Sequence, residues 1–521
     1  MEYVNRISLW SFLSVACFTA LALIWFGADG VRGTDQYSYV ADVERIVNGQ
    51  PPITNLFFPG EILRNNALPD KNYITHNSPM LYIVAMFASV FSAYHAWILV
   101  NVICHLIVAT VVFLLARKFT NQSIATGVTV FYLISPIAIW QTINPLLEMY
   151  FSALLSLILL CFFNRQKLLI ECALWLLLGL GVVSHPIFLM PAFLYGLVRL
   201  YENRHMKKIV LVPLLIAYYA TFYFLLQNKN LWFPTSFAPN LTAIIASVVP
   251  GKSNMVWYFS ELLPELNLQL FIDKFVSALQ QHTIDLKFFP FYMFTNLGIL
   301  GALCVSLLNF KRWWPAILPL GLFGSQYLAM IFLQQNHPRF QQIVAVVTFL
   351  ILAIVVCQWK KSWLLSRFVE ARTVVFFSWL CLVLANFYMV YTAKNESIEE
   401  RNDLSAFVHQ TDRFLVGDDV RLVAIDVKPH SPFASAVRPS DVLFIRTDML
   451  NENKMTSVTS LFGPHFIIAP VDVNVCGEAA VEANMELTSK RFGDLVVYSV
   501  DDLVANKTTL SISVSSDCSS K

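Results

Sequence analysis

The chain is dominated by apolar blocks that are long enough to cross a lipid bilayer. A spanning helix needs about 20 predominantly apolar residues, and runs of this kind recur from the N-terminus to residue 392. Only 13% of the 521 residues are charged and 57% are hydrophobic, whereas a soluble domain carries about 25% charged residues. The composition therefore excludes a soluble enzyme, a disordered chain and a secreted disulfide scaffold. The net charge of +2 gives no support for a nucleic-acid partner.

The apolar runs predict a polytopic α-helical membrane protein with about 11 to 13 transmembrane helices. The first run is longer than the apolar core of a signal peptide, so we interpret it as a retained anchor. The segment 79–93 is too short for a full crossing, and we expect a half-crossing or the start of a broken helix there. The expected spans are 8–28, 97–116, 123–142, 146–163, 168–184, 187–200, 209–226, 288–309, 313–333, 340–358 and 373–392.

Lysine and arginine cluster in every second loop, which sets the orientation because short cytoplasmic loops carry an excess of these residues. All five clusters are cytoplasmic at once if the N-terminus is cytoplasmic. The first loop, 29–79, and the large loop, 227–287, then lie outside. The basic clusters are Arg117 and Lys118; Arg165 and Lys167; Arg199, Arg204, Lys207 and Lys208; Lys311 and Arg312; and Lys360, Lys361, Arg367 and Arg372.

The chain changes character near residue 395, which separates a membrane domain, 1–394, from a C-terminal extracytoplasmic domain, 395–521. From residue 401 onward the net charge is −5, against +7 for the rest. Short β-branched runs and helical patterns predict a small α/β domain. The expected strands are Val420–Val427, Val442–Arg446 and Phe466–Val471, and the expected helices are 402–415 and 478–489.

The end of this domain raises two further expectations. Its last dozen residues are rich in serine and threonine, so we expect them to be disordered. Cys476 and Cys518 both lie outside the membrane. An oxidising compartment allows them to form a disulfide, and the sequence leaves open whether they do.

Strongly polar residues near membrane depth are costly, which makes them candidates for function. Five polar groups fall on the outer side under an orientation chosen from lysine and arginine alone. Each also has an ordinary structural explanation, such as a helix N-cap, a loop or a histidine near a helix break. Their coincidence predicts a polar cavity at the outer leaflet. The groups are Gly33–Tyr39, Tyr73–Pro79, Asn144–Tyr150, Ser184–Pro186 and Asn336–Arg339.

The order of these motifs resembles the GT-C glycosyltransferases, and within them the bacterial protein mannosyltransferase and aminoarabinose transferase group. The resemblance covers roughly residues 1–392 and implies a GT-C-like fold. The segments that carry it are TDQYSYVADVERIVNGQPP, THNSPMLYIV, ISPIAIWQTINPLLEMYFSALLSLILL, GLGVVSHPIFLMP and HPRFQQIVAVVTFLILA.

The resemblance implies an integral membrane glycosyltransferase of the bacterial inner membrane, which takes a sugar from a polyprenyl-phosphate donor to an acceptor on the periplasmic side. Asp35 matches the catalytic aspartate of the family's first loop. Glu148 falls where the family has a second acidic residue, and Arg339 matches an arginine before a late apolar helix.

The chain departs from the aminoarabinose branch at three places, Gln36, Ser38 and the pair His76-Asn77. These departures argue against the transfer of aminoarabinose to lipid A in particular. They leave open the sugar and the acceptor, which is a protein, a lipid or a glycan.

We expect Asp35 to act as general base and Arg339 to contact the donor phosphate. Glu148, with His76 or His185, either holds a divalent metal ion or orients the acceptor. We favour orientation, because the helical ligand spacing of a metal site is missing. A single displacement with one base predicts inversion at the sugar carbon. The candidate substrate-binding residues are Tyr37, Tyr39, Tyr73, His76, Asn77, His185, His337 and Arg339.

Other functions stay open at this stage. The three tyrosines are equally suited to anchoring in the membrane interface. A transporter or flippase for lipid-linked glycans would also need a polar cavity, although such sites lie near the bilayer midplane at repeated broken helices. An O-antigen ligase or polymerase also acts on lipid-linked sugars, and a non-enzymatic scaffold is the remaining alternative.

Overall fold

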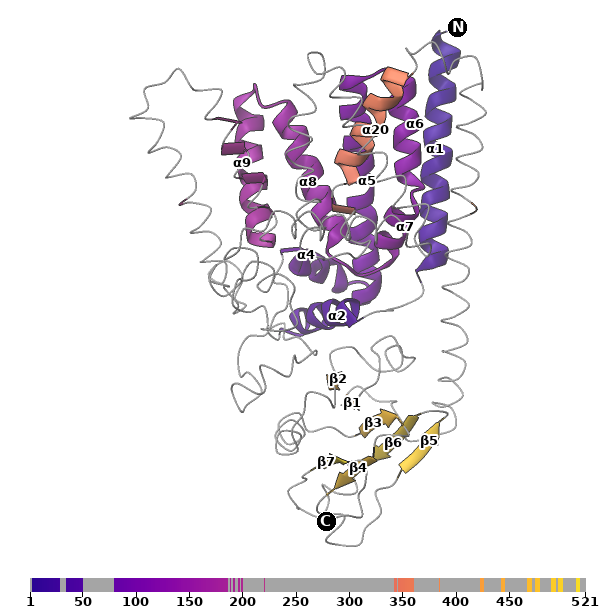
Figure 1. The fold of residues 1–521 in the computed structure, drawn as a ribbon, viewed down its shortest axis with the longest axis vertical. Coiled ribbons are helices and arrows are strands. Elements are labelled where there is room, and N and C mark those ends of the chain that lie inside the picture. The colour runs from indigo at the N-terminus through magenta and orange to yellow at the C-terminus, as the bar shows by residue number, and fades with distance from the viewer. Residues whose placement is uncertain are drawn as a thin grey trace, which may run out of the picture.

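In the computed structural model of the chain (Figure 1), the described residues are 2–28, 34–49, 79–185, scattered positions from 188 to 199, 342–343, 345–359, residues 220 and 384, and seven β-strands beyond residue 420. The helices over this part of the chain are α1 Glu2–Gly27, α2 Thr34–Val47, α4 Pro79–Ala88, α5 Ala93–Phe119, α6 Gln122–Leu133, α7 Pro136–Ile143, α8 Glu148–Phe163, α9 Leu168–Ser184 and α20 Ala345–Trp359.

Two of the described helices are long and apolar enough to cross a membrane, over Trp10–Gly27 and Ala93–Phe119. They correspond to the expected spans 8–28 and 97–116. Helix α5 begins earlier than expected because Ser92 caps it, its hydroxyl accepting a hydrogen bond from the backbone N–H of His95. Helices α8, α9 and α20 follow three further expected spans closely.

The expected number of spans stays a prediction. Those at 209–226, 288–309 and 313–333 lie outside the described residues, as does nearly all of 373–392. The large loop 227–287 lies outside them as well.

The expected span 123–142 is apolar enough to cross a membrane, but it is bent and consists of two helices. The chain breaks between α6 and α7, and the two helices meet at an angle of 46°. The break lies at Ser135 and Pro136, where proline occupies the first turn of α7 and serine its N-cap. Proline has no N–H to continue a helix and restricts the residue before it, so it starts a new helix here.

The segment 79–93 forms a short helix, and its half-crossing of the membrane stays a prediction. Helix α4 has 10 residues, about 15 Å at 1.5 Å per residue, which is half of a hydrocarbon core about 30 Å thick. The chain then turns back into α5. Helices α2 and α4 lie side by side at one end of the bundle (Figure 1).

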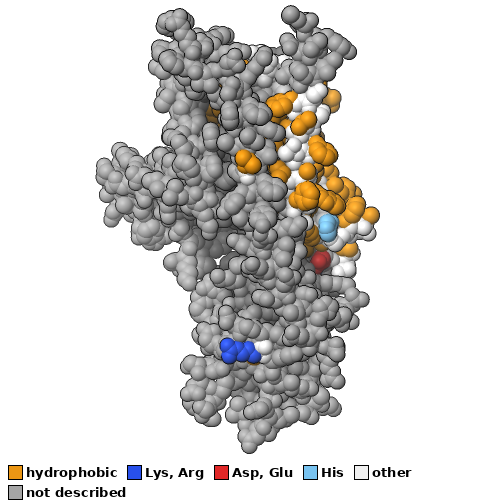
Figure 2. Space-filling model, turned by 90° about the vertical axis from the view of Figure 1, so that its right-hand side faces the viewer, with side chains coloured by type: hydrophobic (Ala, Val, Ile, Leu, Met, Phe, Trp, Pro, Cys, Tyr) orange, Lys and Arg blue, Asp and Glu red, His pale blue; other side chains and the backbone are white. Residues whose placement is uncertain are grey.

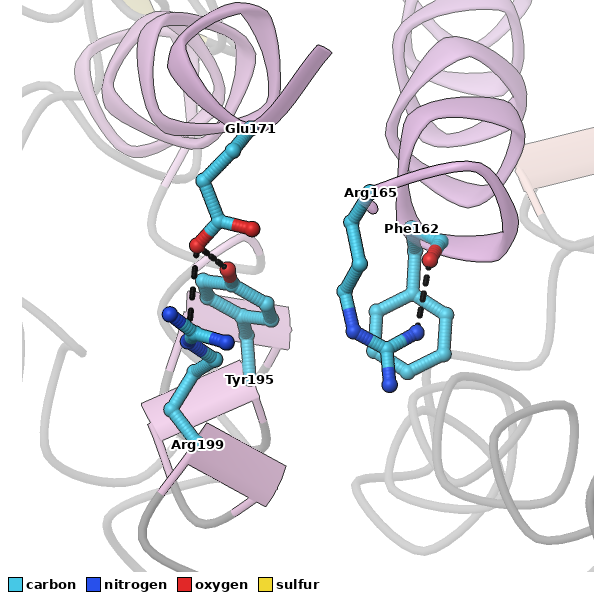
Figure 3. Close-up of polar contacts among 5 residues, drawn as sticks. All are labelled: Phe162, Arg165, Glu171, Tyr195 and Arg199. Carbon is cyan, nitrogen blue, oxygen red and sulfur yellow. Dashed lines mark hydrogen bonds and ion pairs between the residues drawn. The ribbon is translucent and has the colours of Figure 1, made fainter. Parts of the chain in front are cut away.

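The opposite end of the bundle carries basic residues. Lys118 at the end of α5 places its Nζ 2.5 Å from the carbonyl oxygen of Phe163 and 3.0 Å from Asn164 Oδ1, at the end of α8. Arg165 donates to the carbonyl of Phe162 at 2.7 Å and covers that residue's ring (Figure 3). Cations at helix C-termini are favourable because the helix dipole is negative there.

The same end contains an ion pair that connects α9 to the segment after it. Arg199 Nε lies 3.4 Å from Glu171 Oε1, and the Tyr195 hydroxyl donates to the same oxygen (Figure 3). The first two expected cytoplasmic clusters therefore meet at one end of the bundle, where Arg199 of the third also finds a partner.

Large apolar side chains cover the outside of the helices. Trp25 is 80% exposed and Phe18 75%, and hydrophobic side chains gather over the described helical part in Figure 2. Such a surface is unfavourable in water and suits contact with lipid. The core beneath it is formed mainly by α5, with α6 and α8 packed along it.

The C-terminal strands form a five-stranded sheet with the order β2-β1-β3-β6-β5 and a separate pair, β4-β7. β1 is parallel to β2 and β3, and the remaining neighbours are antiparallel. The three expected strands correspond to β1, β2 and β3. The strands are β1 Leu422–Ile425, β2 Val442–Ile445, β3 Phe466–Pro470, β4 Asn474–Gly477, β5 Ser489–Phe492, β6 Leu495–Ser499 and β7 Ile512–Ser515.

The prediction of disorder over the last dozen residues is wrong for β7. This strand pairs antiparallel with β4, so that Ser513 lies opposite Cys476. The alternation of Ile512 and Val514 with serines is a strand pattern that the serine content hides. Cys518, the helix expected at 402–415 and residues 478–488 of the second expected helix lie outside the described residues, while Ser489 begins β5, so the disulfide and the full α/β domain stay predictions.

Candidate functional site

Helix α2 carries the backbone of Asp35 as its second residue. The helix is amphipathic, and its apolar face, including Val40 and Val43, is buried against α4 and α5. Tyr39 is 5% exposed and stacks on the buried Trp97 of α5, with ring centroids 5.7 Å apart. This packing fixes the first-loop helix to the end of the bundle.

A side-chain hydrogen bond joins α2 to the turn between α7 and α8. Gln36 Nε2 donates to Asn144 Oδ1 at 2.9 Å, across 108 positions of sequence, and both residues are buried. Because Gln36 follows Asp35 directly, the bond couples the backbone of the candidate base to the turn that leads into Glu148.

The backbone carbonyl groups at the end of α7 accept hydrogen bonds from side chains of α5. Asn101 of α5 places its Nδ2 2.7 Å from the carbonyl oxygen of Asn144, 3.3 Å from that of Gln141 and 3.5 Å from that of Thr142. The Tyr94 hydroxyl donates to the Ile143 carbonyl at 3.3 Å. The last carbonyls of a helix have no partner within it, so these donors allow α7 to end in a buried place.

Glu148 is the first residue of α8 and is 6% exposed. A carboxylate in the first turn is favoured by the positive end of the helix dipole. The residues around it, from Asn144 to Tyr150, are buried as well. The acidic group expected at a membrane interface is therefore held inside the protein, shortly after Asn144 in the chain, which bonds to Gln36 of α2.

His185 lies at the same end of the bundle as Glu148. It is the C-cap residue of α9, and its ring lies 5.1 Å from that of Phe151. Tyr150 and Ser184 share a hydrogen bond of 3.2 Å. The structure thus brings together three of the five expected polar groups, those of the first loop, the α7–α8 turn and the end of α9, away from the basic end.

The remaining candidates are placed only in part. The ring of Tyr39 packs on Trp97 and is buried, which describes a positioning role better than an open sugar contact. Within the described residues no group of three His, Cys, Asp or Glu side chains is arranged to hold a metal ion. Outside the described residues lie Tyr73, His76, Asn77, His337 and Arg339, together with the side chains of Asp35 and Tyr37.

Two buried polar residues near this end escape the sequence reasoning. Asn101 is fully buried inside an apolar run, where its polarity alone is a signal. Asp42 of α2 is 1% exposed, and burial raises the pKa of its carboxyl to about 8 against the opposing effect of Arg45. Its place among Val40, Val43 and Ile46 on an apolar helix face could have identified it.

Deeper in the bundle lies a second polar cluster. Gln342 Nε2 lies 3.2 Å from the Tyr132 hydroxyl and 3.4 Å from Ser152 Oγ, one helical turn beyond Glu148. His105 stacks on Tyr132 with ring centroids 5.0 Å apart. These contacts attach the segment before α20 to α6 and α8.

Comparisons with known proteins support the fold. No protein family profile and no curated protein sequence matches the chain. Among solved structures, ArnT from Cupriavidus metallidurans, crystallised with undecaprenyl phosphate, matches with a TM-score of 0.53 at 13% identity, over 94% of this chain and 98% of ArnT. The oligosaccharyltransferase of Archaeoglobus fulgidus in its apo form matches with a TM-score of 0.50 at 13% identity, over 91% of this chain and 70% of the transferase.

The similarity to ArnT spans nearly the whole of both chains, and it includes the membrane part from which the motif order was read. It confirms the resemblance that the sequence predicted, at the level of fold. The chain is therefore a multi-pass membrane protein with a GT-C-like fold that resembles the fold of ArnT.

Proposed function

We propose that the protein is an integral membrane glycosyltransferase that moves a sugar from a polyprenyl-phosphate donor to an acceptor. The observation that carries the proposal is the Gln36–Asn144 bond, which couples the helix of Asp35 to the turn before Glu148 at one end of a GT-C fold. ArnT, which has the same fold, was solved with undecaprenyl phosphate. The orientation deduced from the basic loops makes this end the periplasmic face of a bacterial inner membrane.

The reaction needs a base for the acceptor and a group that stabilises the departing phosphate. Asp35 takes the proton from an acceptor hydroxyl while the hydroxyl oxygen bonds to the anomeric carbon. The bond from that carbon to the phosphate oxygen breaks, and polyprenyl phosphate leaves. One displacement inverts the sugar carbon. A general base contributes about 10² to 10⁴-fold to such a rate.

Arg339 neutralises the leaving phosphate, since a guanidinium matches two phosphate oxygens at once. Glu148, together with His185 or His76, orients the acceptor hydroxyl toward Asp35. A divalent metal ion between Glu148 and His76 is the alternative role for this pair. Tyr37, Tyr73, Asn77 and His337 are the proposed contacts to sugar and phosphate.

The test is transfer of a radiolabelled sugar from a panel of polyprenyl-phosphate sugars to membrane extracts. Asp35→Asn is expected to lower transfer by about 100-fold or more. Glu44→Gln is the matched control, because it makes the same carboxylate-to-amide change on the same helix, and it is expected to keep most of the activity. Both variants are first shown to accumulate in membranes to the wild-type level.

Equal transfer by wild type and Asp35→Asn would remove Asp35 as the base. Export of a labelled lipid by reconstituted vesicles, without transfer from any donor, would favour a flippase. Transfer that persists in Asp35→Asn but is lost on changing Arg339 and His337 would favour a ligase or polymerase.

A further inference from the structure

We propose that Asn101 is a positioning residue, which sets the distance between the Asp35 helix and Glu148 without touching substrate. The inference rests on the proposed function, because it assigns a role in the same site. Asn101 lies on α5, is fully buried, and belongs to none of the polar groups that surround the expected cavity.

The contacts of Asn101 all lie at the end of α7. Its Nδ2 is closest to the Asn144 carbonyl oxygen, at 2.7 Å, and lies near two further carbonyls of the last turn. A buried carbonyl without a donor is strongly unfavourable in an apolar setting. The Asn101 amide, which α5 holds in place, therefore contributes most of the side-chain hydrogen bonds to this turn, and Tyr94 supplies one more.

The turn in turn fixes both parts of the candidate site. Asn144 donates its Nδ2 to the carbonyl of Trp140 at 2.6 Å, which orients its Oδ1 toward Gln36. The carbonyl of Asn144 also accepts from the backbone N–H of Leu146 at 2.8 Å, two residues before α8 begins at Glu148. A shift at Asn101 is thus passed to α2 through Gln36 and to Glu148 through the backbone.

A positioning role differs from a purely structural one in what it changes. Displacing reacting groups by about 1 Å can cost about 100-fold in rate, whereas the proposed contact to the donor phosphate, Arg339, does not depend on this turn. Asn101→Leu, which keeps the side-chain volume and removes the donor, is therefore expected to lower kcat by about 100-fold and to change the donor KM by less than about threefold.

Asn101→Asp supplies a readout that packing alone would not move. A protonated carboxyl can donate its O–H to the Asn144 carbonyl, while the ionised form places negative charge against carbonyl oxygens. Burial favours the protonated carboxyl and raises its pKa. The activity of Asn101→Asp relative to wild type is therefore expected to fall as the pH rises through that raised pKa and the carboxyl ionises. The same ratio for Asn101→Leu is expected to be flat.

The experiment uses the full chain in vesicles, with labelled donor and Thr110→Val as control. Thr110 is an exposed residue of α5 whose hydroxyl donates to the carbonyl of Leu106 in its own helix, and its variant is expected to keep wild-type kcat. The double variant Asn101→Leu with Gln36→Leu is expected to have a kcat within about threefold of that of Asn101→Leu alone, because both changes act through Asn144. A kcat for Asn101→Leu within threefold of wild type, or a pH-independent ratio for Asn101→Asp, would overturn the proposal.

A second measurement does not depend on transfer. Leu147 is 2% exposed, so Leu147→Cys is expected to react slowly with a membrane-permeant maleimide. Adding Asn101→Leu is expected to accelerate labelling about tenfold by loosening the turn. If wild type transfers no sugar but labelling accelerates, the proposed function fails and the positioning role of Asn101 stands. Unchanged labelling would reject that role whatever the transfer assay shows.

Discussion

Two asparagines at opposite ends of the bundle use the same local geometry for different purposes. Asn144 ends α7 and Asn164 ends α8, and each donates its Nδ2 to the carbonyl four residues earlier. Each Oδ1 then accepts one further bond, from the buried Gln36 in one case and from the exposed Lys118 in the other. The residue that bonds to Oδ1 therefore distinguishes the two helix ends: the buried Gln36 gives a rigid junction and the exposed Lys118 an adaptable one.

The difference between the two partners is physical. Lys118 is a flexible cation near the membrane surface, where water can replace any bond it loses. Gln36 and Asn144 are buried neutral amides. If the hydrogen bond between them is broken, each side chain loses a partner that water cannot replace. We therefore expect the Gln36–Asn144 end to control activity and the Lys118–Asn164 end to contribute mainly to orientation in the membrane.

The largest expected effect comes from changing the two asparagines in the same way. Asn144→Leu is expected to lower sugar transfer by about 100-fold, because it breaks the bond to Gln36 and moves the turn before Glu148. Asn164→Leu is expected to keep transfer within about threefold. Initial rates at equal membrane content provide the measurement. Similar losses in both variants would show that the two ends are equally coupled to the site.

A smaller effect, on stability, is expected from changing Asp42, whose carboxyl is buried at the same end of the bundle as Gln36. The pKa of this carboxyl is raised from 3.8 to about 8 in the folded chain. Between pH 3.8 and about 8, Asp42 is therefore ionised in the unfolded chain and still protonated in the folded chain. The stability linked to this group is fully present below pH 4 and is lost as pH rises toward 8.

Asp42→Asn imitates the protonated carboxyl and cannot titrate. It is expected to stabilise the protein at pH 7.5, by on the order of 1 to 3 kcal/mol, with the gain disappearing near pH 4. The apparent Tm of both proteins in detergent, measured from pH 4 to pH 8.5, checks this expectation. A constant difference across that range would show that the carboxyl does not titrate as inferred.

The smallest expected effect is at the basic end. Lys118→Met removes the cation from the ends of α5 and α8 while keeping the apolar stem. It is expected to lower stability by less than about 1 kcal/mol, since interactions of exposed cations with helix ends are weak. Transfer is expected to stay unchanged, with thermal melting and initial rates as the two measurements. A clear loss of transfer would contradict the division of roles between the ends.

The sequence predicted those features that depend on local pattern. Apolar length located α1, α8 and α9, and β-branched runs located β1 to β3. The basic loops predicted that Gln36, Asn144 and Ser184 would share one end, and the structure brings them there. Which compartment each end faces stays a prediction, as do the roles assigned to Asp35, Glu148 and Arg339.

The missed features depend on contacts between distant residues. Pro136 in an apolar run is compatible with a kink or with a new helix, and only packing decides between them. The importance of Asn101 becomes visible only when the carbonyls of Gln141 to Asn144 are known to lie beside it. The burial of Asp42 follows from the packing of α2 against α4 and α5, which the local sequence does not show.

The broken span α6–α7 also has a consequence for how the protein is made. The carbonyls that end α7 obtain donors from Tyr94 and Asn101, which belong to a helix synthesised earlier. Helix α7 therefore has no stable buried end until α5 is already inserted. Biogenesis of this membrane domain is expected to follow the order of the chain, with α5 serving as the template on which the next two helices assemble.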